Sequence, residues 1–124
     1  MGATAEDVIR LQVPAQEDYV SLLRATARVV AGRLGCPDDA RTRLQAATGI
    51  AFFALLEDVA AAGIADPGAV RLQVSWDDDR VTAELSSDGR DDTPALAALA
   101  HRDDLADGRE LLDDGAGLRL WVGR

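Results

Sequence analysis

The sequence predicts an α+β fold, a two-layer sandwich in which helices cover one face of a mostly antiparallel sheet. Two observations lead to this prediction. Residues 44–56 contain no charged side chain, which indicates a central buried helix. Segments 70–74 and 81–85 alternate apolar and polar residues on either side of an acidic turn, which indicates a β-hairpin. The predicted element order is β-α-α-β-β-α-β-β in a single domain, residues 1–124, without an internal repeat or a dividing linker.

A strand and an amphipathic helix are predicted at the start of the chain. Residues 9–13 alternate in polarity, and Pro14 is expected to end the strand. Asp18 is the expected N-cap of the helix. Three- and four-residue spacing predicts the apolar stripe of this helix, which contains Val20, Leu23, Ala27, Val30 and Leu34 and is widened by Leu22 and Val29. Arg24, Arg28 and Arg33 lie on the flanks of that stripe.

The other elements are expected to cover the central helix. It should begin at Asp38 or Asp39, after Gly35-Cys36-Pro37 has ended the first helix, and close at Gly63. A helix that is apolar on all sides must be covered on all sides. The uncharged run is shorter than the roughly 20 apolar residues of a membrane span. We therefore expect a core helix and no membrane segment.

The second half of the chain is predicted to supply two hairpins and a short helix. Asp66-Pro67-Gly68 turns the chain, and residues 76–80 join the first hairpin. Its three aspartates lack the ligand spacing and glycine of a calcium loop, so a solvated turn is the favoured interpretation. Thr93 and Pro94 should open a helix running to about residue 105, with Leu96, Leu99 and Ala100 buried. Segments 109–112 and 118–122 predict the closing hairpin.

Composition narrows the class of function. The net charge of −9 repels phosphate backbones, so nucleic-acid binding is disfavoured. A basic partner protein would suit this surface, although acidity for solubility is the simpler interpretation. A single cysteine, Cys36, cannot form an internal disulfide, and the first eight residues lack the basic and apolar segments of a signal peptide. These features predict a cytoplasmic protein.

The predicted element order and three stretches of sequence resemble the histidine-kinase-like (GHKL) ATPase fold, and within it the anti-sigma-factor serine kinases of bacterial partner-switching systems. The stretches are IRLQVPAQEDYVSLLRATARVVAGRLG, LQAATGIAFFALLEDVAAAG and RVTAELSSDG. They are similar to the family's first strand and helix, its nucleotide-binding helix, and the strand before its Asp-x-Gly-x-Gly turn. The resemblance covers nearly the whole chain.

The resemblance implies nucleotide-site residues that this chain lacks. The family's central helix carries a Glu and, four residues later, an Asn that holds Mg²⁺. Here that pair falls on Gly49 and Phe53, or one residue later on Ile50 and Ala54. Neither pair offers the oxygen ligands that a hard cation requires. We therefore expect no catalytic, cofactor-binding or metal-binding residue, and ATP with Mg²⁺ only if the protein is an active kinase.

The family's adenine-binding turn and phosphate lid are also missing. Matching on Gly89 puts Ser87 at the position of the family's aspartate, and Asp88 is one place out of register. Thr93 follows too closely to leave room for a lid. The sequence thus predicts a retained fold with a degenerate nucleotide site, and Phe52 and Phe53 are expected to fill the volume left by the ligand.

Other chemistry-bearing residues have simpler interpretations. His101 has no nucleophile partner in the sequence, and a role as an exposed helix-end residue is favoured over that of a general base. Cys36 lacks basic sequence neighbours and is interpreted as structural. A solvated acidic face is favoured over a metal site for the aspartates that follow His101, namely Asp103, Asp104, Asp107, Asp113 and Asp114.

The leading functional hypothesis is a non-catalytic regulatory module that binds another protein. The resemblance implies a sigma factor, a STAS-domain antagonist or another GHKL-type chain as partner. Tyr19, Arg24 and Arg28 are predicted to form part of the binding surface, with simple solvation of the helix flank as the alternative. The first strand and helix could also form a homodimer. Two alternatives remain: an active serine kinase that phosphorylates a STAS antagonist, and a protein that binds another small ligand in the remnant pocket.

Overall fold

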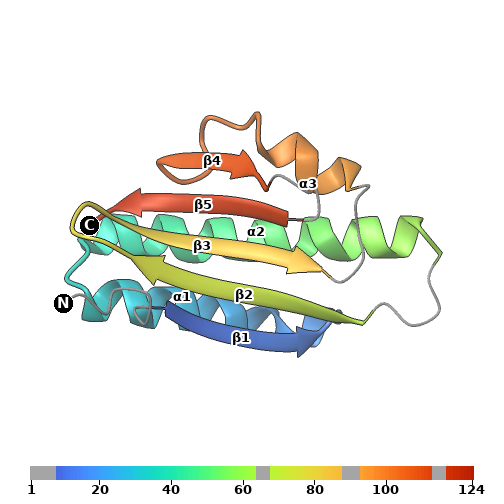
Figure 1. Ribbon diagram of the computed structural model, residues 1–124, viewed down its shortest axis with the longest axis horizontal. Coiled ribbons are helices and arrows are strands. Elements are labelled where there is room, and N and C mark those ends of the chain that lie inside the picture. Colours follow the sequence, from blue (N-terminus) through green and yellow to red (C-terminus); the bar gives the residue numbers. More distant parts are fainter. Residues whose placement is uncertain (1–7, 64–67, 88–92, 113–116) are drawn as a thin grey trace.

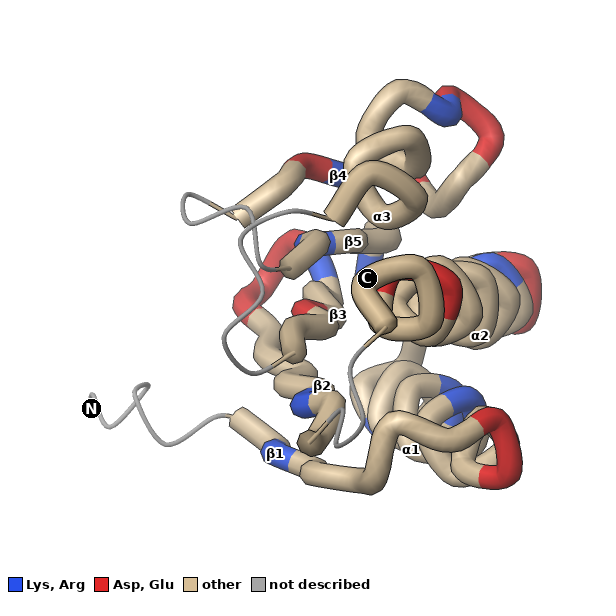
Figure 2. The backbone as a smooth tube through the Cα atoms, turned by 90° about the vertical axis from the view of Figure 1, so that its right-hand side faces the viewer, with Lys and Arg blue, Asp and Glu red and all other residues tan. Residues whose placement is uncertain are grey.

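A computed structural model describes residues 8–63, 68–87, 93–112 and 117–124. In it a five-stranded antiparallel sheet, with strand order β1-β2-β3-β5-β4, is covered on one face by helices (Figure 1). The two layers are seen edge-on in Figure 2, with α1 and α2 on the same side of the sheet. The predicted α+β sandwich of two layers is confirmed.

The elements follow one another in the order β1, η2, α1, α2, β2, β3, α3, β4, β5, where η2 is a short 3₁₀-helix. The strands are β1 (Val8–Pro14), β2 (Ala69–Trp76), β3 (Arg80–Ser87), β4 (Gly108–Leu111) and β5 (Gly117–Gly123). The helices are η2 (Glu17–Tyr19), α1 (Val20–Arg33), α2 (Asp38–Ala61) and α3 (Pro94–Leu99).

The core lies between the sheet and the helices. Successive residues of a strand point to opposite faces, so one alternating set from each central strand is buried against the helical layer. On β2 this set contains Val70, Leu72 and Val74, and on β5 it contains Leu118, Leu120 and Val122. The helical layer contributes Leu23 from α1 and Leu44, Phe52 and Leu55 from α2. The other face of the sheet carries mainly polar side chains.

The N-terminal end of α1 differs from the prediction. Asp18 lies inside η2, and Tyr19 occupies the N-cap position without a side-chain hydrogen bond. The expected Asp18 cap is therefore wrong. Leu22 and Val29 are also not part of the buried stripe, since they are 46% and 56% exposed. The face of α1 that packs against the sheet and α2 is formed by Leu23, Ala27, Val30 and Ala31. Leu22 and Val29 lie outside this face.

α2 begins at Asp38, as expected, but it is not covered on all sides. Phe52 is fully buried, whereas the adjacent Phe53 is 47% exposed. α1, α3 and the sheet cover three sides of α2 and leave the fourth open, so the prediction of complete burial is wrong. By length and composition α2 is also the single described helix that could cross a membrane, and half of its apolar window is buried inside this fold, as in the core helices of soluble proteins.

The turn between β2 and β3 is closed by Asp77. Its Oδ1 accepts hydrogen bonds from the backbone N–H groups of Asp79 (2.8 Å) and Arg80 (3.0 Å). These bonds hold the pKa of Asp77 below its ordinary value. The carboxylate of the first of the three aspartates therefore stabilises the turn. The predicted turns at residues 66–67 and 113–115 lie outside the described residues.

The short helix α3 ends earlier than predicted, at Leu99 rather than near residue 105. Leu96 and Leu99 are buried as expected, while Ala100 is half-buried against the core. Thr93 does occupy the N-cap position, and Pro94 stands at the start of the helix, but the Thr93 side chain makes no cap hydrogen bond. The N–H groups at the start of α3 are bound instead by a residue of α2.

Candidate protein-binding groove

Gly49 allows α1 and α2 to approach closely at one point. A Cβ atom on Gly49 would lie 2.9 Å from Cδ of Arg24 on α1, closer than van der Waals contact permits. The aliphatic part of the Arg24 side chain therefore rests on the backbone of α2. Because glycine lacks a side chain, the surface of α2 is hollowed at this position.

A groove of about 230 Å³ opens at this contact, and it is lined by Arg24, Ala46, Gly49, Ile50 and Phe53. Its wall is mostly apolar and includes the exposed ring of Phe53. The guanidinium group of Arg24 is the charged group in the lining, and Arg24 makes no ion pair with any described residue. An exposed aromatic ring beside an arginine can bind an apolar and an acidic group together.

The three residues predicted to bind a partner have different surroundings. Arg24 lines the groove, but Arg28 is held by α2. Its Nη2 lies 3.0 Å from Oδ1 of Asp38, and its Nη1 donates hydrogen bonds to Gln45 and Thr42. Tyr19 is half-buried and packs against the core. The structure thus brings Arg24 together with Gly49 and Phe53, and it gives Arg28 and Tyr19 contacts within the fold.

The two alternative pairs matched to the nucleotide site are not separated cleanly on α2. Gly49 and Phe53 line the groove beside α1, and so does Ile50 of the second pair. Ala54 lies one helical turn before Asp58 and therefore on the side of α2 that contacts α3. Neither pair supplies an oxygen ligand. The expectation that Phe53 fills a nucleotide cavity is wrong, because its side chain is exposed, whereas Phe52 is part of the core.

Asp58 joins α2 to the start of α3, a role that the sequence did not reveal. Its Oδ1 accepts a hydrogen bond from the N–H of Ala95 (2.8 Å) and its Oδ2 from the N–H of Leu96 (3.0 Å). The residue is 4% exposed. A carboxylate at a helix N-terminus satisfies free N–H groups and interacts favourably with the helix dipole. The sequence indicates this role of Asp58 only by the presence of an acidic residue near the C-terminal end of α2.

Ser87 lies at the end of β3 and is buried, and its Oγ has no hydrogen-bond partner among the described residues. Gly89 and Asp88 lie outside the described residues. The position that the family's adenine-binding aspartate would take is thus occupied by a buried hydroxyl group, which carries no charge.

The remaining candidates are separate from the groove. His101 is exposed after α3, and Cys36 is buried, which raises the pKa of its thiol although Arg124 and Arg41 act in the opposite direction. The described aspartates near His101 pair with arginines: Asp103 with Arg109, Asp104 with Arg102 and Asp107 with Arg43. No group of three potential metal ligands forms within the described ranges. Asp113 and Asp114 lie outside them.

No protein-family model matches this chain, and no curated protein sequence matches it. The groove must therefore be interpreted from its own chemistry. Its lining, as far as the described residues form it, contains neither a nucleophile nor a carboxylate, so these residues can bind and orient another molecule but offer no group for acid–base or nucleophilic catalysis.

Proposed function

We propose that this chain is a cytoplasmic, non-catalytic regulatory module that binds another protein through the groove between α1 and α2. The observation that carries the proposal is the exposed ring of Phe53 beside Arg24, above the gap left by Gly49. Aromatic residues and arginine are enriched among the residues that dominate binding energy at protein interfaces. Phe53 is 47% exposed, so burying the rest of its side chain in a complex would contribute about 0.8–1.5 kcal/mol, half of the value for a fully exposed side chain.

The circuit in which this module acts is proposed from the resemblance to anti-sigma-factor serine kinases of the GHKL superfamily. The partner is then a sigma factor, a STAS-domain antagonist or another GHKL-type chain. A homodimer through β1 and α1 is a related arrangement, because β1 is an edge strand of the sheet. The exposed Leu22 and Val29 on α1 would add apolar area to such a dimer.

The alternative is an active serine kinase that uses Mg²⁺ and ATP. The loss of nucleotide binding is favoured because neither helical pair supplies a magnesium ligand. Asp58 also holds the start of α3 directly against α2, one helical turn after Ala54. We therefore expect no heat of binding when the purified chain is titrated with Mg²⁺-ATP in a calorimeter. Micromolar affinity in that titration would favour the kinase.

Phe53→Ala and Arg24→Glu are expected to weaken partner binding by about tenfold or more each, since each removes an anchor worth roughly 1.4 kcal/mol or more. The measurement is calorimetric titration of the purified variants with purified sigma factors and STAS-domain proteins of the same host. Leu111→Ala is the control, because Leu111 on β4 is an exposed apolar residue, at 37%, that lies neither in the groove nor on β1 or α1. Unchanged affinity in both groove variants, or equal loss in the control, would contradict the proposal.

A further inference from the structure

The free edge of β1 and one side of α1 form a continuous side of the molecule. Among the described residues, β1 pairs with β2 alone. Figure 2 shows β1 and α1 at the same end of the two layers, with β2 and α2 further inward. Of the five large apolar side chains that are exposed in the described ranges, three lie on this side, namely Ile9, Leu22 and Val29. An edge strand flanked by exposed apolar residues is a surface on which another chain can pair.

Leu22 and Val29 lie on the side of α1 that faces away from α2. Arg24 marks the side that packs on α2, because its side chain rests on Gly49. Successive residues are about 100° apart around a helix, so Leu22 and Val29 lie roughly 140–160° from Arg24. Arg33 continues the same stripe one turn after Val29. α1 therefore presents this stripe at the end of the helical layer, beside the edge of β1.

The backbone groups that face the free edge of β1 belong to its even-numbered residues. Opposite residues of antiparallel strands alternate between pairs that exchange hydrogen bonds and pairs that do not. The N–H of Ala15 donates to the carbonyl of Gly68, which continues the register of β1 and β2, so the odd-numbered residues of β1 are bonded to β2. The N–H groups that point to the free edge are therefore those of Val8, Arg10 and Gln12.

These groups select one register for the pairing of β1 with a copy of itself. In antiparallel pairing about a two-fold axis at Leu11, Arg10 lies opposite Gln12 of the other copy, and Val8 lies opposite Pro14. Every outward N–H then has a carbonyl acceptor, and the proline, which cannot donate, stands at the end of the pair. An axis at Arg10 would place the two Arg10 side chains opposite each other, where like charges are destabilising. An axis at Gln12 would leave the N–H of Val8 without an acceptor in β1.

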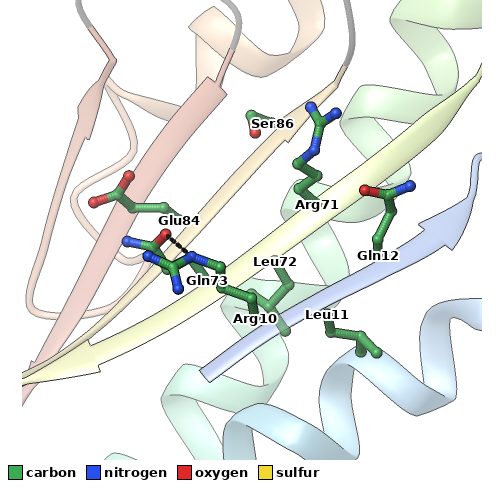
Figure 3. A pocket seen from close by; sticks show the side chains of 8 residues that line it. All are labelled: Arg10, Leu11, Gln12, Arg71, Leu72, Gln73, Glu84 and Ser86. Carbon is green, nitrogen blue, oxygen red and sulfur yellow. Dashed lines mark hydrogen bonds between the residues drawn. The ribbon is translucent and has the colours of Figure 1, made fainter. Parts of the chain in front are cut away.

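The axis at Leu11 also suits the side chains on both faces of the sheet. Leu11, which is half-buried against the core, meets Leu11 of the other copy on the helical face. Ile9, 41% exposed, lies opposite Val13 of the other copy. Arg10 stays on the open face, where its Nε donates a hydrogen bond to Gln73 (3.2 Å; Figure 3). Pairing therefore covers apolar area without burying a charge.

α1 is complementary to its own copy about the same axis. β1 and α1 are roughly 24 and 21 Å long and follow each other in opposite directions, so their midpoints lie at about the same height. A two-fold axis at residues 25–26, within about one residue of the midpoint of α1, places Leu22 near Val29 of the other copy and Arg33 near Asp18. Neither Arg33 nor Asp18 forms an ion pair with a described residue. Helices pack roughly 8–10 Å apart, about two strand spacings, so the helical layers meet when the sheets join.

We propose that this chain forms a two-fold homodimer, in which β1 pairs with β1 of a second copy about Leu11 and the outer sides of the two α1 helices pack together. This inference specifies the homodimer named above as a related arrangement, and it does not rest on partner binding in the groove. Each groove lies on the other side of α1, next to α2, and stays open in the dimer. A partner with two binding segments would then bind both grooves with increased avidity.

Analytical ultracentrifugation of the purified chain should show a monomer–dimer equilibrium. Val29→Glu should raise the dimer dissociation constant about tenfold or more, because it places a carboxylate against Leu22 of the other copy. Leu111→Glu is the matched control, since it makes the same kind of change at an exposed apolar residue on β4, the opposite edge of the sheet. It should dimerise like the wild type. A wild-type chain that stays monomeric at millimolar concentration, or equal effects of the two variants, would overturn the proposal and leave the groove untouched.

Disulfide cross-linking tests the register. In a Cys36→Ala background, which removes the native thiol, Leu11→Cys places two thiols on the two-fold axis. Their Cα atoms would be about 4.5 Å apart, within the range of a disulfide. Ile9→Cys is the matched control, because its two copies would be about 14 Å apart, too far for a disulfide. Mild oxidation should give a covalent dimer of the Leu11→Cys chain and little of the Ile9→Cys chain on a non-reducing gel. Equal cross-linking of the two, or of neither, would contradict this register.

Discussion

Replacing Phe52 with alanine is expected to lower the free energy of unfolding by about 3–5 kcal/mol. Phe52 is the largest of the fully buried side chains, and it lies between the sheet and the helical layer. Its removal loses apolar burial and leaves a cavity that the surrounding strands cannot close, because a packed core relaxes only partly. Urea denaturation followed by circular dichroism would measure the change.

Phe53→Ala is the matched comparison, since it removes the same group one residue further along the same helix. Its side chain is about half exposed, and we expect a loss of less than about 1 kcal/mol. If Phe52→Ala fails to fold, Phe52→Leu retains most of the volume and should cost about 1–1.5 kcal/mol. Equal destabilisation by the two alanine variants would show that the assignment of one ring to the core and the other to the groove is wrong.

The sequence alone could not distinguish these two phenylalanines. Both belong to the uncharged run of residues 44–56, where apolar residues occur on every side of the helix and define no polar face. The open side of α2 is set by the neighbouring elements. α1 packs across Gly49 through Arg24, and the sheet covers the side that contains Phe52.

Strand positions were predicted more successfully than helix ends. A period of two is visible within five residues, so the segments at 9–13, 70–74, 81–85 and 118–122 all lie in observed strands. Asp18 and Thr93 were predicted to cap α1 and α3, but neither side chain makes a cap hydrogen bond. These predictions assumed that the nearest polar side chain in the sequence binds the free N–H groups at the start of a helix. At α3 this role belongs to Asp58, which is distant in sequence and reaches the helix only after the chain has folded.

The groove between α1 and α2 was predicted only in part, because its residues come from two helices that are separate in the sequence. Arg24 was identified from the first helix and Gly49 with Phe53 from the second, but no spacing rule links positions on separate helices. A homodimer through the first strand and helix was expected from the sequence, but its register was not predicted. Only the pairing of β1 with β2 shows which backbone groups of β1 face the free edge.

Asp58→Ala is expected to destabilise the protein by about 2–3 kcal/mol, although the variant removes only a few polar atoms. The backbone N–H of Leu96 is buried, and both it and that of Ala95 would lose a charged acceptor. α3 contains only six residues, too few to persist without tertiary contacts. Loss of the Asp58 contact should therefore release α3 from α2 before the rest of the fold opens.

This local effect separates a specific capping role from a general loss of stability. Native-state hydrogen exchange should show that the amides of Ala95 and Leu96 exchange faster in Asp58→Ala, while amides of β2 and β3 change only by the global destabilisation. Glu57→Ala removes an adjacent, exposed carboxylate and should change stability by less than about 0.5 kcal/mol. Asp58→Asn, which keeps one acceptor oxygen, should lie between them. If Glu57→Ala and Asp58→Ala behave alike, the contact between α2 and α3 does not depend on the Asp58 carboxylate.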